Sequence, residues 1–135
     1  LADRALSAAA AKGASDFGRI TPDADYVWGS AVTFSDLQAG DIIQFRDYVA
    51  DVETVTETPD ATNTRTEQYT RPHHTAIVEQ VGADGMVTVL EQNAPDGTPA
   101  TRTRLFFTSG SFSSGDTTTT VRVRGTLWYY RPQAR

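Results

Sequence analysis

"HTAIVEQVGADGMVTVLEQ", residues 74–92, has the pattern of two short strands joined by a tight turn. Apolar and β-branched residues dominate both halves, and "GADG" supplies the glycines that favour a reversal between antiparallel strands. We therefore predict a β-hairpin with arms at residues 74–81 and 86–92. In such a hairpin the start of the first arm lies beside the end of the second arm.

The chain on both sides of this hairpin also favours strands. Threonine and glutamate dominate residues 51–70, which predicts a polar hairpin or an excursion from the sheet. Gly125 marks a candidate bulge in the final strand, and residues 93–100, "NAPDGTPA", predict a loop. The further strands and strand arms are predicted at residues 41–50, 51–57, 64–70, 101–108 and 117–131.

Residues 1–12 predict an α-helix, because alanine dominates them and Gly13 is a suitable stop. Small alanine side chains would let this helix lie close to a sheet. We therefore predict an α+β fold, with an N-terminal helix packed on an antiparallel sheet of about six strands. The chain begins with Leu1 and no N-cap precedes it, so we expect one domain over residues 1–135 that lacks its N-terminal segment.

Composition narrows the classes of function. A length of 135 residues suits one domain, and a formal net charge of −5 argues against nucleic acid as a partner. No apolar run approaches the roughly 20 residues of a membrane-spanning helix. There is no cysteine, so these residues contain no disulfide, no thiolate metal site and no cysteine nucleophile.

His73 and His74 are the only histidines in the chain. Neighbouring residues on a strand point to opposite faces, so the two imidazoles are poorly placed to share one metal ion. No H-x-H or HExxH spacing is present either. We therefore predict no metal site and no cofactor, and ordinary polar residues at the start of a strand remain one interpretation of the pair.

The predicted hairpin offers a second interpretation, because it brings residues 91–93 close to the two histidines. A histidine that acts as a base needs a carboxylate or amide partner to fix its tautomer and orientation. Glu91 and Asn93 share one strand face, and Gln92 takes the other. A polar strand end that closes a loop would explain the same residues without catalysis.

Three motifs in order carry a resemblance to a known group of enzymes. "LQAGDIIQF" at residues 37–45, "HHTAIVEQV" at 73–81 and "VTVLEQN" at 87–93 resemble the papain-like amidases and peptidases of the NlpC/P60 and CHAP type. The resemblance implies that His74 is the general base and that Glu91 or Asn93 orients it. It also implies a cysteine nucleophile shortly before Leu1, at the start of the first helix. We assign substrate binding to His73, Gln92 and Trp28.

The resemblance also implies a substrate and a location. It predicts cleavage of an amide in peptidoglycan or a related peptide, by a secreted or cell-envelope protein. The alternative is a non-catalytic module that binds a cell-wall peptide or glycan, or acts as an assembly subunit, through its threonine-rich strands. The oligomeric state is not predicted.

Overall fold

A computed structural model describes residues 1–93 and 97–135. Seven strands form one antiparallel sheet in the order β1-β7-β2-β3-β4-β5, and β6 pairs with β7 beside β1. The elements are α1 (Ala2–Ala8), β1 (Ser30–Val32), β2 (Ile42–Glu57), β3 (Thr62–Val81), β4 (Met86–Glu91), β5 (Thr101–Phe106), β6 (Gly110–Ser114) and β7 (Thr117–Arg131), with 3₁₀ turns at Ala14–Asp16 and Phe34–Asp36.

The predicted α+β class is wrong, because the described residues form a mainly-β structure with one seven-residue α-helix. The helix expected over residues 1–12 ends at Ala8. Ala10 adopts a φ of 54°, Ala11 bridges to Ala134, and the Lys12 N–H donates to the Gln133 carbonyl at 2.8 Å. Pairing with the chain's C-terminal end therefore overrides the helical preference of the alanines.

The hairpin at residues 74–92 is confirmed, since β3 pairs with β4 in a register that places Val78 opposite Val89. The arms expected at 51–57 and 64–70 are also strands, and they pair with each other. They are not a separate hairpin, however. Each continues an inner strand without a break, which makes β2 16 residues long and β3 20 residues long.

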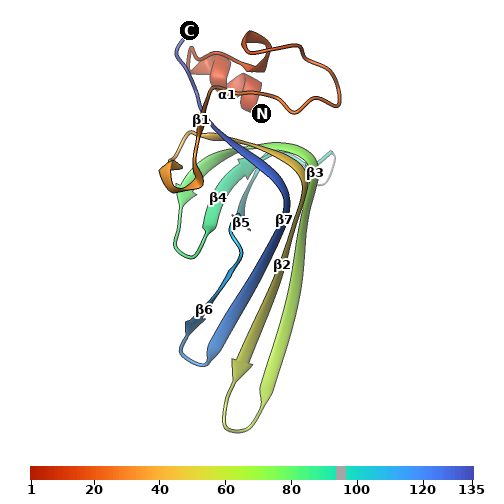
Figure 1. Ribbon diagram of the computed structural model, residues 1–135, viewed down its shortest axis with the longest axis vertical. Helices are drawn as coiled ribbons and strands as arrows, with labels where there is room; N and C mark the ends of the chain where they lie inside the picture. The colour runs from red at the N-terminus through yellow and green to blue at the C-terminus, as the bar shows by residue number, and fades with distance from the viewer. Residues whose placement is uncertain (94–96) are drawn as a thin grey trace.

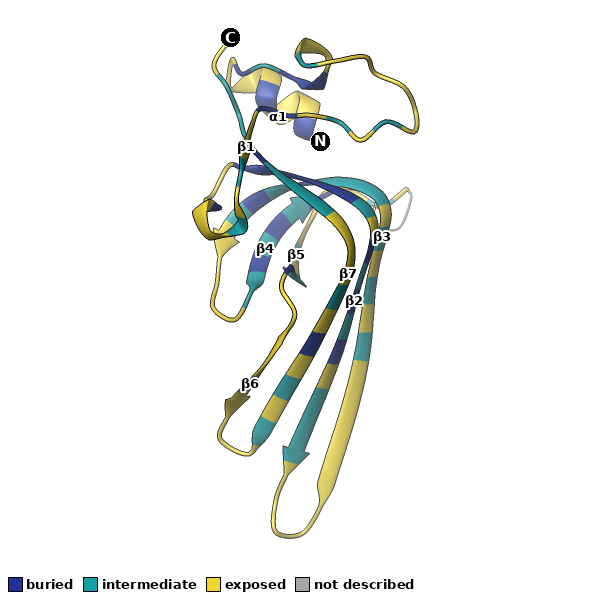
Figure 2. Cartoon of the chain, in the orientation of Figure 1, coloured by how far each residue is buried: buried dark blue, intermediate teal, exposed yellow. Residues whose placement is uncertain are grey.

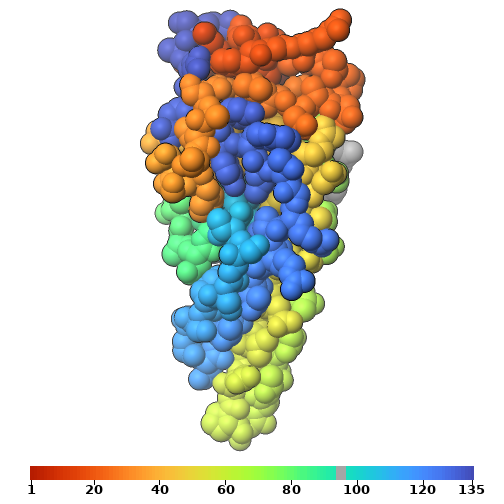
Figure 3. Space-filling view, in the orientation of Figure 1, coloured from red at the N-terminus to blue at the C-terminus, as the bar shows by residue number. Residues whose placement is uncertain are grey.

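These long strands give the molecule a broad end and a narrow arm (Figures 1 and 3). The broad end holds α1, both termini, β4 and β5, and the arm consists of the distal parts of β2, β3 and β7 together with β6. Buried residues gather in the broad half, and the distal part of β3 is exposed (Figure 2). The hydrophobic core therefore lies in the broad end.

Two hydrophobic clusters cover the two faces of the sheet. The larger one fills the concave face and includes Ile43, Phe45, Tyr48, Ala76, Val78, Val87, Val89, Leu105 and Phe107. The smaller one joins α1, through Ala2 and Leu6, to Ile42 and Tyr130 on the opposite face. The helix thus does pack on the sheet, through one alanine and one leucine, although it contributes little to the fold.

A backbone irregularity in β2 separates the broad end from the arm. The register between β2 and β7 shifts between Arg46 and Val49, and Asp47 has a φ of 53°. Gly125 of β7, with a φ of 95°, lies against this segment. The bulge predicted in the final strand at Gly125 therefore lies instead in β2, directly opposite this glycine.

Two further predictions concern the loops and the membrane. The loop expected at 93–100 contains residues 94–96, which lie outside the described residues. Within residues 1–93 and 97–135, no helix has the length and apolar character that crossing a membrane requires.

Candidate functional site

The buried carboxylate of Glu91 lies at the end of β4 and binds two basic side chains from β3. His74 Nε2 lies 2.9 Å from Glu91 Oε1. Arg71 donates to both carboxylate oxygens, from Nε at 3.0 Å and from Nη2 at 2.7 Å. The Glu91 side chain is 1% exposed, whereas those of His74 and Arg71 are 11% and 14% exposed. The three residues form an ion-pair network on the concave face of the sheet.

The contact with Glu91 defines the tautomer of His74. A carboxylate only accepts hydrogen bonds, so Nε2 carries the hydrogen that lies between the two groups. Nδ1 is then the nitrogen that can accept a proton, and it has no hydrogen-bond partner within the described residues. The imidazole ring also packs against Phe45, with 5.6 Å between ring centroids. His74 is therefore oriented by a carboxylate and held by an aromatic ring.

The pKa of Glu91 reflects this environment. Burial alone would raise the pKa, but hydrogen bonds from His74, Arg71 and Thr103 outweigh it and lower the pKa to about 2. Glu91 is therefore ionised at neutral pH. A buried carboxylate with two basic partners supplies a fixed negative charge next to the imidazole.

This pKa predicts a pH dependence of stability. The folded pKa of about 2 lies below the usual value of 4.5, so Glu91 stabilises the fold above pH 4.5, and that contribution falls as the pH drops towards 2. The shift corresponds to about 3 kcal/mol. In urea unfolding curves, the stability difference between the wild type and Glu91→Gln should shrink by that order over this pH range. A difference that does not change with pH would contradict the assignment.

A cavity of about 340 Å³ lies next to His74 and opens to solvent. One wall is the start of α1, at Leu1–Asp3. The other wall is formed by β2, β3, the segment that precedes β1 and the residues that follow β4. The residues of this second wall are Tyr26, Trp28, Gln44, His73, His74, Thr75, Gln92 and Asn93. His74 is therefore one of the residues that line a cavity whose far side is the first turn of the helix, while its ring contacts Glu91 and Phe45.

Gln44 forms part of the cavity wall and is itself buried. Its Oε1 accepts hydrogen bonds from Trp28 Nε1 at 2.9 Å and from Thr75 Oγ1 at 2.7 Å. Indole nitrogen is only a donor, so the amide cannot be turned the other way. Gln44 Nε2 has no protein partner among the described residues. Trp28 thus helps to hold the Gln44 side chain in the wall, and its indole N–H is already used in that hydrogen bond.

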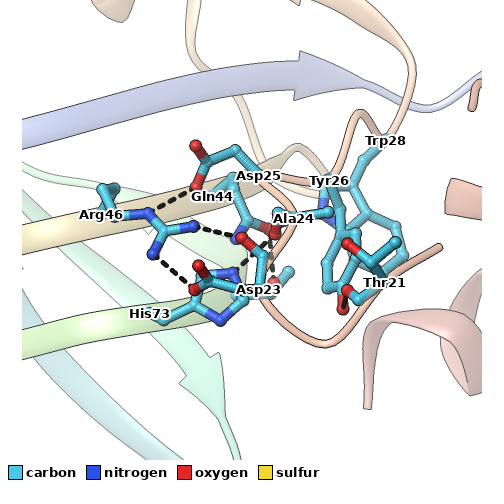
Figure 4. Close-up of polar contacts among 10 residues, drawn as sticks. Thr21, Asp23, Ala24, Asp25, Tyr26, Trp28, Gln44, Arg46 and His73 are labelled. Carbon is cyan, nitrogen blue, oxygen red and sulfur yellow. Dashed lines mark hydrogen bonds and ion pairs between the residues drawn. The ribbon is translucent and has the colours of Figure 1, made fainter. Parts of the chain in front are cut away.

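His73 and Arg46 attach the segment 21–28 to the sheet (Figure 4). His73 Nε2 donates to the Ala24 carbonyl at 2.6 Å. Arg46 binds Asp25 at 2.8 Å and the Asp23 carboxylate at 2.9 Å, and this contact lowers the pKa of Asp23. The two histidines therefore face different partners, as expected for neighbours on a strand.

The structure brings together some of the residues selected from the sequence and separates others. His74 and Glu91 are in direct contact, and His73, Gln92 and Trp28 line the same cavity. Asn93 also lines it but does not orient His74. Its side chain accepts a hydrogen bond from the Gly97 N–H at 3.2 Å, and its φ is 60°. Of the two orienting residues left open by the sequence, only Glu91 contacts His74.

Two residues of the site were not selected from the sequence. Arg71 was overlooked because residues three apart on a regular strand point to opposite faces, yet Arg71 and His74 both reach Glu91. Gln44 was overlooked because it sits inside an apolar run, "IIQF". A polar residue between buried apolar residues was the available signal, since such a group needs a hydrogen-bond partner.

The nature of the site is indicated neither by metal-binding side chains among the described residues nor by similar proteins. In the described part of the chain no group of three or more histidine, cysteine, aspartate or glutamate side chains could hold a metal ion. Comparison of the chain with family models, curated proteins and solved structures finds no match.

Proposed function

We propose that this domain is a thiol-dependent amide hydrolase in which His74 is the general base and Glu91 orients it. One observation carries the proposal: His74, whose imidazole binds the Glu91 carboxylate, is among the residues that line a cavity whose opposite wall is Leu1–Asp3. A nucleophile at the amino end of α1 would share that cavity with His74. The order of motifs that resembles NlpC/P60 and CHAP enzymes supports the same chemistry and is independent of the geometry.

In the proposed reaction His74 Nδ1 takes the proton of the thiol, and the thiolate attacks the carbonyl carbon of the amide. The C–N bond then breaks, and the imidazolium returns the proton to the departing amine. Water, deprotonated by the same nitrogen, attacks the resulting thioester. This step releases a carboxylic acid and restores the thiol. Glu91 remains ionised throughout and stabilises the imidazolium.

The proposed substrate is a peptide amide, with cell-wall peptide as the class that the motif resemblance favours. An open cavity of about 340 Å³ suits a short, extended segment of chain better than a folded protein. A secreted or cell-envelope location would follow from that substrate. Relationship to the NlpC/P60 and CHAP enzymes is part of the same proposal.

The activation of a thiol at this position can be tested directly, because residues 1–135 contain no cysteine. Leu1→Cys places one thiol at the helix start, on the cavity wall. We expect iodoacetamide to alkylate it at pH 7 about tenfold faster than the same thiol in Leu1→Cys/His74→Ala, because a nearby imidazolium increases the thiolate fraction. The rate is followed by intact-protein mass spectrometry.

The matched control is Ala8→Cys, at an exposed position at the other end of the same helix. Its alkylation rate should not respond to His74→Ala. If the rates of Leu1→Cys with and without His74 are equal, the imidazole does not activate a thiol across this cavity, and the hydrolase proposal fails. Circular dichroism of each variant confirms that the rates refer to folded protein.

A further inference from the structure

The distal half of β3 has one unpaired edge. β3 pairs with β2 from Thr62 to Ile77, whereas β4 covers its other edge only from Ile77 to Val81. Between Thr62 and Thr70 no strand of residues 1–93 or 97–135 pairs with this outer edge. Figures 1 and 2 show this part of β3 at the margin of the arm, almost entirely exposed.

This edge lacks most of the features that usually prevent strands from pairing between molecules, and its two charged residues, Arg65 and Glu67, have opposite signs. Natural edge strands are kept short, bulged or covered, or they carry proline or charged side chains, lysine above all. The segment Thr62–Thr70, "TNTRTEQYT", contains neither proline nor lysine, and it pairs with β2 in an unbroken register. Pro72 is the first residue along the strand that lacks a backbone donor. The edge is therefore open for nine residues.

We propose that this edge is a homodimer interface, in which the β3 strands of two copies pair antiparallel about a two-fold axis at Thr66. The proposal does not depend on the hydrolase function. In this register Arg65 of each copy lies opposite Glu67 of the other, and Thr62 lies opposite Thr70. Directly opposed residues share a sheet face, and opposite charges there are favourable. The interface contains two such ion pairs related by the axis.

The charges also exclude the neighbouring registers. An antiparallel two-fold pairing keeps the hydrogen-bond pattern only when residues of the same parity oppose each other. Moving the axis by one residue places Arg65 or Glu67 opposite its own copy, which is unfavourable. Within one chain Arg65 already binds Glu67 at 3.0 Å, on the same face. A second copy therefore extends an existing row of alternating charge.

The expected dimer is weak, because nine paired residues bury less surface than the roughly 1,200 Å² typical of stable complexes. We expect sedimentation equilibrium between about 10 and 500 µM to show reversible association from the monomer mass of 14.7 kDa to twice that value. Arg65→Glu and Glu67→Arg each convert two attractive pairs into two repulsive ones. Each variant should associate at least about tenfold more weakly than the wild type.

The decisive measurement is an equimolar mixture of the two variants. An R65E chain opposed to an E67R chain restores opposite charges at both pairs, so the mixture should associate as the wild type does. Arg102→Glu is the control for net charge, since Arg102 is exposed and pairs with Glu79. That variant should associate normally. Circular dichroism checks that each variant is folded.

Two results of these association measurements would contradict the proposed dimer. A wild type that remains monomeric over the whole range overturns the proposal, as does a mixture that remains monomeric while the wild type associates.

A second variant tests the register without altering charge. Thr66→Cys places two thiols across the axis, and mild oxidation should join them into a disulfide-linked dimer. Thr64→Cys, which faces Gln68 of the other copy, should form at least about tenfold less of that product.

Discussion

Glu91→Ala is expected to lower the free energy of unfolding by about 3 to 5 kcal/mol, because it removes one side of a buried ion-pair network. Arg71 and His74 are mostly buried, and each loses its carboxylate partner. The cost lies mainly in leaving the Arg71 guanidinium without a counter-charge inside the protein, where water cannot replace it fully. Urea unfolding at pH 7, followed by tryptophan fluorescence, measures the difference.

The matched control is Glu79→Ala, which removes a glutamate of β3 that also binds an arginine. Arg102 donates two hydrogen bonds to Glu79, but both side chains are in contact with solvent, at 65% and 33% exposure. An exposed pair contributes at most about 1 kcal/mol. Equal losses in the two variants would mean that burial of Glu91 has no energetic consequence, which would contradict the network described above.

Gly125→Ala is expected to cost about 4 kcal/mol or more, or to prevent folding at 37 °C. The φ of Gly125 is 95°, and an added Cβ would lie 2.2 Å from the Asp47 carbonyl oxygen and 2.8 Å from the Tyr48 Cα. Both contacts are with backbone atoms, so no side-chain rotation relieves them. Tyr48 is fully buried, and its hydroxyl donates to the Phe106 carbonyl at 2.6 Å. The bulged segment therefore cannot move aside at little cost.

Gly115→Ala separates the clash from backbone strain. Gly115 also has a positive φ, of 60°, but no atom lies within 4 Å of an added Cβ. The expected cost is about 1 kcal/mol, which is that of placing an L-residue in a left-handed conformation. In thermal unfolding, Gly125→Ala should reduce the melting temperature by about 10 °C or more beyond Gly115→Ala. Similar melting temperatures would rule out the close approach of β7 to β2.

Part of the candidate site could be predicted because it depends on a hairpin. A four-residue turn between two strands places the start of one beside the end of the other, so His74 and Glu91 were expected to be neighbours. Which partner binds the imidazole depended on where β4 ends. The strand stops at Glu91, and Asn93 turns away to bind the Gly97 N–H. Strand ends are determined by packing as much as by local sequence.

The role of Arg71 could not be predicted by counting residues along the strand. Pro72 lies between the paired positions Arg71 and His73, opposite Asp47, the residue of β2 with a positive φ. The strands are irregular there, so simple alternation does not assign faces correctly.

The length of the arm was not predicted either, for a related reason. Polar threonine-rich residues are compatible with a loop excursion or with a long strand, and only their cross-strand partners distinguish the two.

By itself, the sequence determined the hairpin at residues 74–92, the final strand at 117–131 and the pairing of His74 with a residue of the following strand. These features follow from alternation and turn residues, which act between near neighbours. Only the tertiary structure decided that the helix ends at Ala8, that Arg71 shares Glu91 with His74, and that no strand of the described residues pairs with the distal edge of β3. Each of these depends on contacts between residues far apart in the chain, and local patterns carry no record of them.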